Sequence, residues 1–373
     1  MRILFAIPGL HRVNRGAEIA FIAIATELAK SGHQVSLIGS GPPRPGCPYS
    51  FLQARCVSRQ RFERFPRLPL LRSETGWEEL TFVPSLLRHY LPAAYDVTVT
   101  CGFPFTNLVL RRPVLSGRRP AHFFVTQNGD WPAWSGDAEF RLFGCDGLIC
   151  TNPDFYERNR KRYPSALIPN GVDLAKFSPG PAIRDKFGLP RSGRVILMVS
   201  ALIASKNVDL AIEAVSRIGD ATLVVAGDGP LRAELASVAQ AKIPGRYRQL
   251  TARPSEMPDL YRSADIFLHL SRDESFGNVF VEALAVGTPV VAFDLPRTRW
   301  IVGDCGFLAD RGDPSGLVDQ IEFASRSGST ERARSLARAA EFSWAEVARK
   351  YALFFEDVVS ARTQAGANAE SPV

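Results

Sequence analysis

The stretch S-R-D-E-S-F-G-N-V-F-V-E-A-L-A-V-G-T-P-V-V-A, residues 271–292, carries the clearest structural signal in the chain. An apolar run ends at Leu270, a polar turn containing Gly277 follows, and a helical stretch then continues to Gly287 before the next apolar run. A strand, a turn, a helix and a strand in this order predict one repeat of a parallel sheet with a right-handed crossover.

The turn and helix of this block also carry binding groups. Ser275 or Asn278 can cap the helix, and the free N–H groups at its start favour an anion. Glu274 lies on the turn and Glu282 eight positions later in the helix. One carboxylate can reach the far end of an elongated ligand, and the other can accept hydrogen bonds from a diol, which is how ribose is usually bound. The expected ligand-binding residues here are Glu274, Ser275, Phe276, Gly277, Asn278 and Glu282.

Similar alternation of apolar runs and helical stretches extends in both directions from the block. In the second half we expect strands at 195–199, 222–226, 248–250, 266–270 and 289–293, and helices near 208–218, 230–240, 257–263, 278–286 and 314–325. In the first half we expect a strand at 3–7, a helix at 17–30 and strands at 34–38, 96–100, 121–126, 147–150 and 165–169. Two such series predict an α/β protein with two doubly wound Rossmann-like domains.

A Pro- and Gly-punctuated segment around residues 174–190 separates the two series and is typical of a linker. We therefore expect one domain at 1–175, a second at 176–345, a terminal helix at 346–363 that crosses back to the first domain, and a disordered tail at 364–373. Residues 41–74 are rich in Pro and Arg and predict a long surface excursion that could contain a short hairpin. Ligands of such sheets lie outside the carboxyl ends of the strands, which predicts a site in a cleft between the domains.

Three more loops of the second half carry candidate donor-binding residues. Lys206 follows one strand and precedes a helix, where an ammonium group can neutralise a diphosphate. The turn Gly227-Asp228-Gly229 allows a ligand to approach the backbone closely. Arg253 follows the next strand. The alternatives are that Lys206 is an ordinary surface lysine and that Gly227-Asp228-Gly229 is an ordinary strand-to-helix turn.

Two loops of the first half carry the remaining candidates. In the loop between the first strand and first helix, Asn14 could bind the acceptor, and Gly16 would let a phosphate or sugar approach the helix. After the strand at 121–126, amides and an indole could bind an acceptor sugar, and a carboxylate could act as a base. Those residues are Gln127, Asn128, Trp131 and Asp130. The alternative is an Asn-Gly turn beside a packed tryptophan.

The block at 271–292 resembles the E-x7-E motif of retaining glycosyltransferase family 4 (group 1), whose fold is GT-B. Residues 168–173 (I-P-N-G-V-D) resemble that family's linker, and residues 199–206 and 226–230 resemble its first two C-domain loops. The resemblance covers residues 165–325 well and the first half more loosely. It implies that Glu274 contacts the donor sugar, Glu282 the ribose and Lys206 the diphosphate, and that the Arg253 loop lies near the base. It also implies that the first domain binds the acceptor and the second the donor.

The same resemblance implies transfer with retention of configuration and without a metal or other cofactor, from a nucleotide-sugar donor that we expect to be a UDP- or GDP-sugar. We therefore expect Glu274, Lys206 and Asp130 to be the catalytic groups. The sequence departs from the family at Ala201, where many members have an arginine that contacts the pyrophosphate. Arg272 is the nearest cation in sequence that could replace it. It also has Gln127–Asp130 where many relatives have a histidine.

The net charge of +7 is unevenly distributed, since residues 1–180 carry +8 and the remainder −1. A basic half suggests an anionic partner, and Leu68–Arg72 with the flanking Arg61, Arg64 and Arg67 could contact anionic lipid headgroups. A solvated basic surface is the alternative. Charge alone, without a recognisable motif, does not indicate nucleic-acid binding.

The apolar start of the chain is too short for a signal peptide and ends in Pro8-Gly9, and no apolar stretch is long enough to span a bilayer. We expect a cytoplasmic protein with peripheral contact at the inner face of the plasma membrane.

The sequence therefore predicts a hexosyltransferase that acts on a glycan, lipid-linked or small-molecule acceptor in cell-surface polysaccharide or glycolipid synthesis. A nucleotide-sugar epimerase of the same architecture and a non-catalytic nucleotide-sugar binding protein are the alternatives. The base, the sugar, the acceptor and the oligomeric state do not follow from the sequence.

Overall fold

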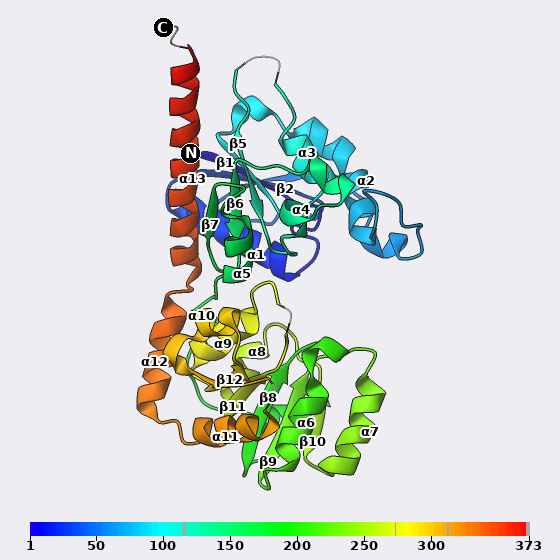
Figure 1. Cartoon of the computed structure of the whole chain (residues 1–373), viewed down its shortest axis with the longest axis vertical. Coiled ribbons are helices and arrows are strands. Elements are labelled where there is room, and N and C mark those ends of the chain that lie inside the picture. The colour runs from blue at the N-terminus through cyan, green and yellow to red at the C-terminus, as the bar shows by residue number, and fades with distance from the viewer. Residues whose placement is uncertain (115–116, 273, 312, 371–373) are drawn as a thin grey trace. The chain divides into compact units, whose positions relative to one another are not determined.

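The computed structural model describes residues 1–114, 117–272, 274–311 and 313–370. The chain divides into two compact units, of which unit 1 comprises Met1–Asn170 with the C-terminal segment from Trp344, and unit 2 comprises Gly171–Ser343 (Figure 1). Each unit contains one parallel sheet with helices on its faces, which confirms the predicted α/β class with two doubly wound Rossmann-like domains.

The sheet of unit 1 has the strand order β3-β2-β1-β4-β5-β6-β7, with every pair parallel. Its strands are β1 (Arg2–Ala6), β2 (Gln34–Gly39), β3 (Ser50–Gln53), β4 (Val97–Thr100), β5 (Ala121–Val125), β6 (Gly147–Cys150) and β7 (Ser165–Leu167). Phe5 of β1 pairs with Leu37 on one side and Val99 on the other. The central strands are buried because helices cover both faces of a parallel sheet. The order reverses between β1 and β4, which marks the switch point where such folds bind ligands.

The helices of unit 1 include one from the far end of the chain. They are α1 (Gly16–Lys30), α2 (Glu74–His89), α3 (Phe105–Leu110), α4 (Trp131–Trp134), α5 (Pro153–Asn159) and α13 (Trp344–Glu370). α13 packs on α1 and buries Tyr351 and Phe355 in the same core as Phe5. It continues past the expected boundary at 363, and the last three residues of the expected tail lie outside the described residues.

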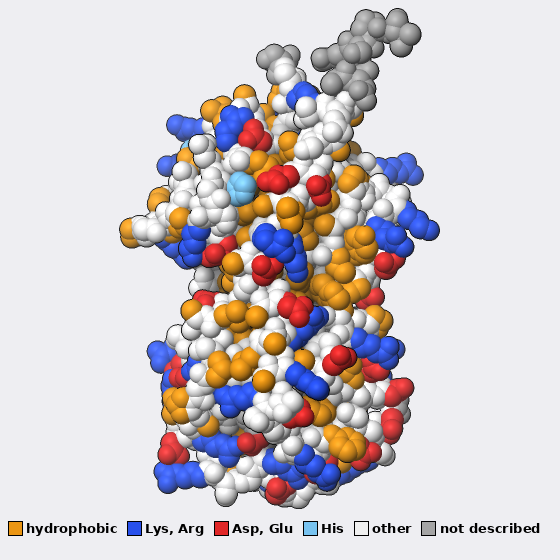
Figure 2. All heavy atoms as spheres, turned by 90° about the vertical axis from the view of Figure 1, so that its left-hand side faces the viewer, with side chains coloured by type: hydrophobic (Ala, Val, Ile, Leu, Met, Phe, Trp, Pro, Cys, Tyr) orange, Lys and Arg blue, Asp and Glu red, His pale blue; other side chains and the backbone are white. Residues whose placement is uncertain are grey.

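Hydrophobic side chains also lie at the surface beside α13 (Figure 2). Leu353 is 48% exposed and lines a groove of about 930 Å³ between this helix and the edge strand β7. Within the described part of the chain, no helix combines the length and the apolarity that crossing a bilayer requires.

The segment 41–74 contains more regular structure than the expected surface excursion. It supplies the edge strand β3, whose Phe51 ring stacks on His11 with 3.9 Å between the ring centroids. A 3-10 turn at Arg59–Phe62 follows, and Leu68 then forms an antiparallel bridge with Leu71. The sequence pattern hides β3 because a four-residue edge strand with mixed polarity shows no clear period.

The sheet of unit 2 has the order β10-β9-β8-β11-β12-β13, again with every pair parallel. Its strands are β8 (Arg194–Val199), β9 (Ala221–Ala226), β10 (Tyr247–Leu250), β11 (Ile266–His269), β12 (Val290–Phe293) and β13 (Gly306–Ala309). Its helices are α6 (Val208–Ser216), α7 (Arg232–Lys242), α8 (Met257–Arg262), α9 (Asn278–Val286), α10 (Pro296–Val302), α11 (Pro314–Ala324) and α12 (Ser329–Ala340). The switch point lies between β8 and β11.

Candidate functional site

The predicted donor-binding residues of unit 2 follow the carboxyl ends of four neighbouring strands. Lys206 follows β8, Gly227 follows β9, Arg253 follows β10 and Glu274 follows β11. Because parallel strands end at the same edge of a sheet, these loops gather there, and Lys206 and Glu274 come from the two strands that flank the switch point.

Lys206 and Glu274 form an ion pair across this switch point. Lys206 ends the 3-10 turn Ala204–Lys206, and its ammonium contacts the Glu274 carboxylate and lies 3.3 Å from Ser271 Oγ. Burial opposes the ionisation of Glu274, but the neighbouring His269 and Lys206 outweigh it and lower the pKa of Glu274 to about 2. The carboxyl is therefore ionised at every physiological pH, and the structure brings together the first two predicted groups.

His269 lies directly beneath this ion pair. Its ring packs edge-on against Phe280, and its Nε2 is 3.3 Å from the Glu274 carboxylate. The side chain is 3% exposed, and burial lowers the pKa of His269, so the ring is neutral near pH 7.

Glu282 faces a tyrosine that the sequence did not single out. The hydroxyl of Tyr261, on α8, donates a hydrogen bond of 2.9 Å to Glu282 Oε2. Burial raises the pKa of Glu282 to about 7, although Tyr261 and the more distant Lys176 favour its charged form. Tyr261 itself is fully buried, so it fixes the position of the carboxylate.

The loop between Glu274 and α9 differs from expectation in two details. The N-cap of α9 is Gly277, with φ +98°, rather than Ser275 or Asn278. Gly277 supplies no side-chain cap, and the start of a helix favours an anion. Phe276, which was also predicted to bind the donor, packs its ring against Trp300 and Phe342 in the core, so its side chain is not exposed to a ligand.

The same loop is supported from below by a buried arginine that the sequence did not indicate. Arg297 of α10 donates hydrogen bonds to the carbonyl of Glu274 at 2.6 Å and to that of Arg272 at 3.0 Å. Arg272, the expected substitute for the missing cation at Ala201, is exposed, and its neighbour Asp273 lies outside the described residues.

The close approach of two loops explains why glycine occupies the positions after β9. A Cβ on Gly227, whose φ is +153°, would lie 2.0 Å from the carbonyl oxygen of Ser200, and one on Gly229 would lie 2.5 Å from that of Leu202. The loops after β8 and β9 therefore lie directly against each other, and only glycine permits this. Asp228 accepts a hydrogen bond from Gly229 N at 2.8 Å and is exposed.

Arg253 is exposed and bound locally rather than held in a prepared position. Its guanidinium pairs with Glu256 at 2.9 Å, and its backbone N–H donates to the same carboxylate.

In unit 1, the predicted acceptor residues lie at the carboxyl ends of β1 and β5. Asn14 is exposed in the loop after β1, and Gly16 begins α1. Asn128 is exposed as well, whereas Gln127 is buried and exchanges two amide hydrogen bonds with Asn170. Gln127 therefore joins the loop after β5 to the end of the domain.

Asp130 is also held by its neighbours. It is 3% exposed, accepts a hydrogen bond of 2.7 Å from Asn159 Nδ2 and forms an ion pair with Arg158 at 3.1 Å. Burial raises the pKa of Asp130, and Arg158 opposes that rise. Trp131 is 44% exposed, but its indole packs against Phe140, with 5.0 Å between the ring centroids.

A polar cluster at the switch point of unit 1 escaped the sequence analysis. Arg12 pairs with Glu78, and Arg15 pairs with Glu18 at 2.8 Å. The adjacent buried Glu79 accepts a hydrogen bond from Thr106 N, and burial raises its pKa to about 7. No single motif signals this cluster, because its members come from the loop after β1 and from α1, α2 and α3.

Two doubly wound units, one of which has an ammonium–carboxylate pair at its switch point and a second carboxylate on the helix that follows, are typical of the GT-B fold. A family model described as glycosyl transferases group 1 matches residues 180–341, and one described as glycosyltransferase family 4 matches residues 14–176. The two matches follow each other without overlap and cover both units. The chain belongs to glycosyltransferase family 4, group 1.

Individual relatives agree with this assignment. D-inositol 3-phosphate glycosyltransferase of Mycolicibacterium smegmatis is 34% identical over 200 residues, which are 50% of this chain and 46% of that protein. The chain spans about half the length of the curated relatives it matches.

Two solved structures share the fold. Sucrose-phosphate synthase from Thermosynechococcus elongatus superimposes with a TM-score of 0.73 at 19% identity, over 96% of this chain and 99% of that chain. Anabaena HepE in complex with UDP and glucose superimposes with a TM-score of 0.69 at 19% identity, over 96% and 100%. The predicted GT-B fold is therefore confirmed.

Proposed function

We propose that this chain transfers a sugar from a nucleotide diphosphate sugar to an acceptor, with retention of configuration and without a metal. The observation that carries the proposal is the placement of Lys206 and Glu274 on either side of the unit 2 switch point, with Glu282 on the helix that follows. This set offers a cation for a diphosphate, a carboxylate for sugar hydroxyls and a second carboxylate for a ribose diol.

In the proposed reaction, the bond between the anomeric carbon and the diphosphate oxygen breaks while an acceptor oxygen bonds to the same face of that carbon. The proton of the acceptor hydroxyl passes to the departing phosphate oxygen. Lys206 and the N–H groups at the start of α9 stabilise the negative charge that develops on the diphosphate. Glu274 orients the sugar through its hydroxyls, and Glu282, held by Tyr261, orients the ribose.

The donor is best identified first, by melting curves with UDP, GDP, ADP and their sugars, because a ligand that binds only the folded protein raises its melting temperature. A fold neighbour that holds UDP and glucose makes UDP-sugars the first to test.

With the donor known, turnover of Lys206→Ala and Glu282→Ala should fall by about 100-fold or more, since each removes a charged contact. Lys242→Ala is the matched control, because Lys242 is an exposed lysine on α7 whose ion pair with Glu213 lies outside the site. Near-normal turnover in both site variants would refute the site. Conversion of the donor sugar without release of nucleoside diphosphate would indicate an epimerase, and donor binding without turnover would indicate a binding protein.

We also propose that unit 1 contacts an anionic membrane surface, through the segment that contains Arg61–Arg72. This segment projects from the side of unit 1 opposite α13 (Figure 1). Phe65 and Leu68 are 47% and 44% exposed, next to the exposed Arg61, Arg64 and Arg67. Among the described residues, these three arginines have no ion-pair partner, so their charge is available to lipid phosphates.

Flotation with vesicles that contain anionic lipid tests this proposal. We expect binding that falls with added salt, and a loss of binding in the triple variant Arg61→Gln, Arg64→Gln, Arg67→Gln. A control that changes Arg191, an exposed arginine of unit 2, should bind normally. Binding that is equal on neutral and anionic vesicles would contradict the proposal, and a lipid-linked acceptor would then lose its support.

A further inference from the structure

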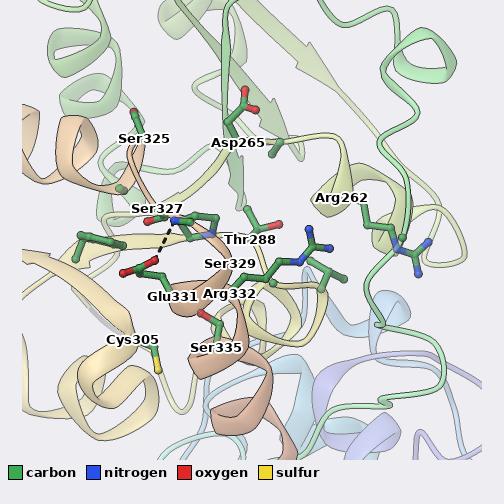
Figure 3. Close-up of a pocket in the computed structure, with 18 residues that line it drawn as sticks. Arg262, Asp265, Thr288, Cys305, Ser325, Ser327, Ser329, Glu331, Arg332 and Ser335 are labelled. Carbon is green, nitrogen blue, oxygen red and sulfur yellow. Dashed lines mark hydrogen bonds between the residues drawn. The ribbon is translucent and has the colours of Figure 1, made fainter.

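Unit 2 has a cavity at the opposite edge of its sheet from the proposed donor site. It has a volume of about 530 Å³ and lies where β11, β12 and β13 begin, next to the end of α9 and the start of α12 (Figure 3). Asp265 and Pro289, which precede β11 and β12, line it, whereas Glu274 follows the carboxyl end of β11. A volume of this size is within the range of small-molecule sites.

The lining of this cavity contains hydroxyl groups without partners. The Oγ of Ser327 is shielded from water and makes no hydrogen bond to another described residue. Ser335 of α12 is 3% exposed, has no hydrogen-bond partner among the residues that the structure describes, and lies between Glu331 and Arg332 in the wall of the cavity (Figure 3). Ser327 Oγ is closed off from the cavity itself, whereas Ser335 Oγ faces it, so the Ser335 hydroxyl, unpaired within the described part of the chain, indicates a polar partner in the cavity.

The charges in the lining are balanced. Asp265 is bound by Arg184 at 2.6 Å, and Arg262 by Asp259 at 2.9 Å. Glu331 accepts a hydrogen bond from Gly328 N, which Figure 3 shows as a dashed line. Arg332 has no ion pair with another described residue, and its stem lies over Gly287.

Apolar groups complete the lining. Val286, Pro289, Phe307 and Ala324 form part of the wall. An apolar surface flanked by a carboxylate, a guanidinium and hydroxyls matches a ligand whose faces are apolar and whose rim carries both donors and acceptors.

We propose that this cavity binds a neutral, polyhydroxylated ligand of the size of one sugar ring. The ring packs against Phe307 and Pro289, its hydroxyls donate to Glu331 and accept from Arg332, and the hydroxyl of Ser335 gains the partner it lacks. The site goes beyond the proposed function and does not depend on it. A phosphorylated ligand fits less well, because the Glu331 carboxylate repels it.

The free thiol of Cys305 lines the cavity and gives a local readout (Figure 3). The experiment follows alkylation of the full-length protein by iodoacetamide, peptide by peptide in a mass spectrometer, with D-glucose, D-galactose, D-mannose or N-acetylglucosamine present. A sugar at about three times its dissociation constant should slow Cys305 alkylation about fourfold. Cys47, a half-buried thiol of unit 1, should react at an unchanged rate.

Variants on the lining identify the contacts. Ser335→Ala should weaken the protecting sugar about fivefold, the effect of one hydrogen bond, and Arg332→Ala should weaken it at least as much. Arg334→Ala changes an exposed arginine of the same helix that does not line the cavity, and should leave the ratio of rates with and without sugar unchanged.

Failure of all four sugars to protect Cys305, or equal protection of Cys47, would overturn the proposal. Equal protection by inorganic phosphate would overturn the assignment of a neutral ligand. None of these measurements requires turnover, so their failure is distinct from failure of the proposed transferase activity.

Discussion

Glu282→Gln should stabilise the protein at alkaline pH while it weakens the donor site. In the folded chain, burial raises the pKa of this carboxyl from 4.5 to about 7. Because the folded pKa is raised, the contribution of this group to the free energy of unfolding is fully present below the unfolded pKa of 4.5. That contribution is lost as the pH rises through the folded pKa of about 7. The neutral amide avoids that loss and can still accept the hydrogen bond from Tyr261.

The size of the effect follows from the two pKa values. A difference between 4.5 and about 7, at about 1.36 kcal/mol per unit, gives about 3 kcal/mol of added stability for Glu282→Gln at pH 8. At pH 5 the gain falls below about 1 kcal/mol, and at pH 4 it nearly disappears, because the carboxyl is then largely protonated in both states.

Urea unfolding at pH 4, 5 and 8, followed by hydrogen exchange in peptides of unit 2, measures this gain for the unit that contains the change. Glu213→Gln is the control, since Glu213 is a partly exposed glutamate on α6 whose pKa is lowered by Lys242 and Arg217. It should not stabilise the protein. The reasoning is refuted if Glu282→Gln is no more stable than the parent at pH 8, or if the gain persists at pH 4.

Three further outcomes test other contacts. Tyr261→Phe removes the donor to Glu282, so the pH midpoint of donor binding should move upward from about 7 by about one unit, and an unmoved midpoint would count against Glu282 as the diol ligand. Asp130→Asn should leave stability at pH 7 within about 1 kcal/mol of the parent, because burial disfavours the charged form of Asp130 while Arg158 and Asn159 favour it, and kcat should stay within about tenfold; a fall of more than about 100-fold would make Asp130 the catalytic base instead. Gly227→Ala should cost at least about 2 kcal/mol in a melting or urea experiment, because its Cβ meets Ser200 O, and normal stability would show that the loops separate easily.

The sequence was most informative where structure and chemistry share one motif. The block at 271–292 combines a turn glycine, a helix and two carboxylates, and its strand, helix and following strand lie as predicted within a residue or so at each end. Buried strands read as apolar runs because both faces are covered, which also made β8, β9 and β12 visible.

Elements with weak patterns were missed. α12 is strongly polar and buries only Ser335 and Ala339, so it shows no apolar stripe, and β13 is a short, half-buried edge strand. Supporting residues were missed for a different reason. Tyr261 and Arg297 act on the site from other helices, and a contact between positions far apart in the chain leaves no local signal.

The ion pair between Lys206 and Glu274 bears on what the proposed site can select. A free diphosphate would draw the ammonium away and leave the partly buried Glu274 carboxylate without its cation, beside a neutral histidine. A nucleotide sugar brings hydroxyl donors for that carboxylate together with the phosphates for the lysine, so both charges keep partners. The penalty for an unpaired charge thus favours the intact donor over its nucleotide product. The same pairing gives a physical reason for an acidic and a basic residue to meet at a site whose ligand is itself anionic.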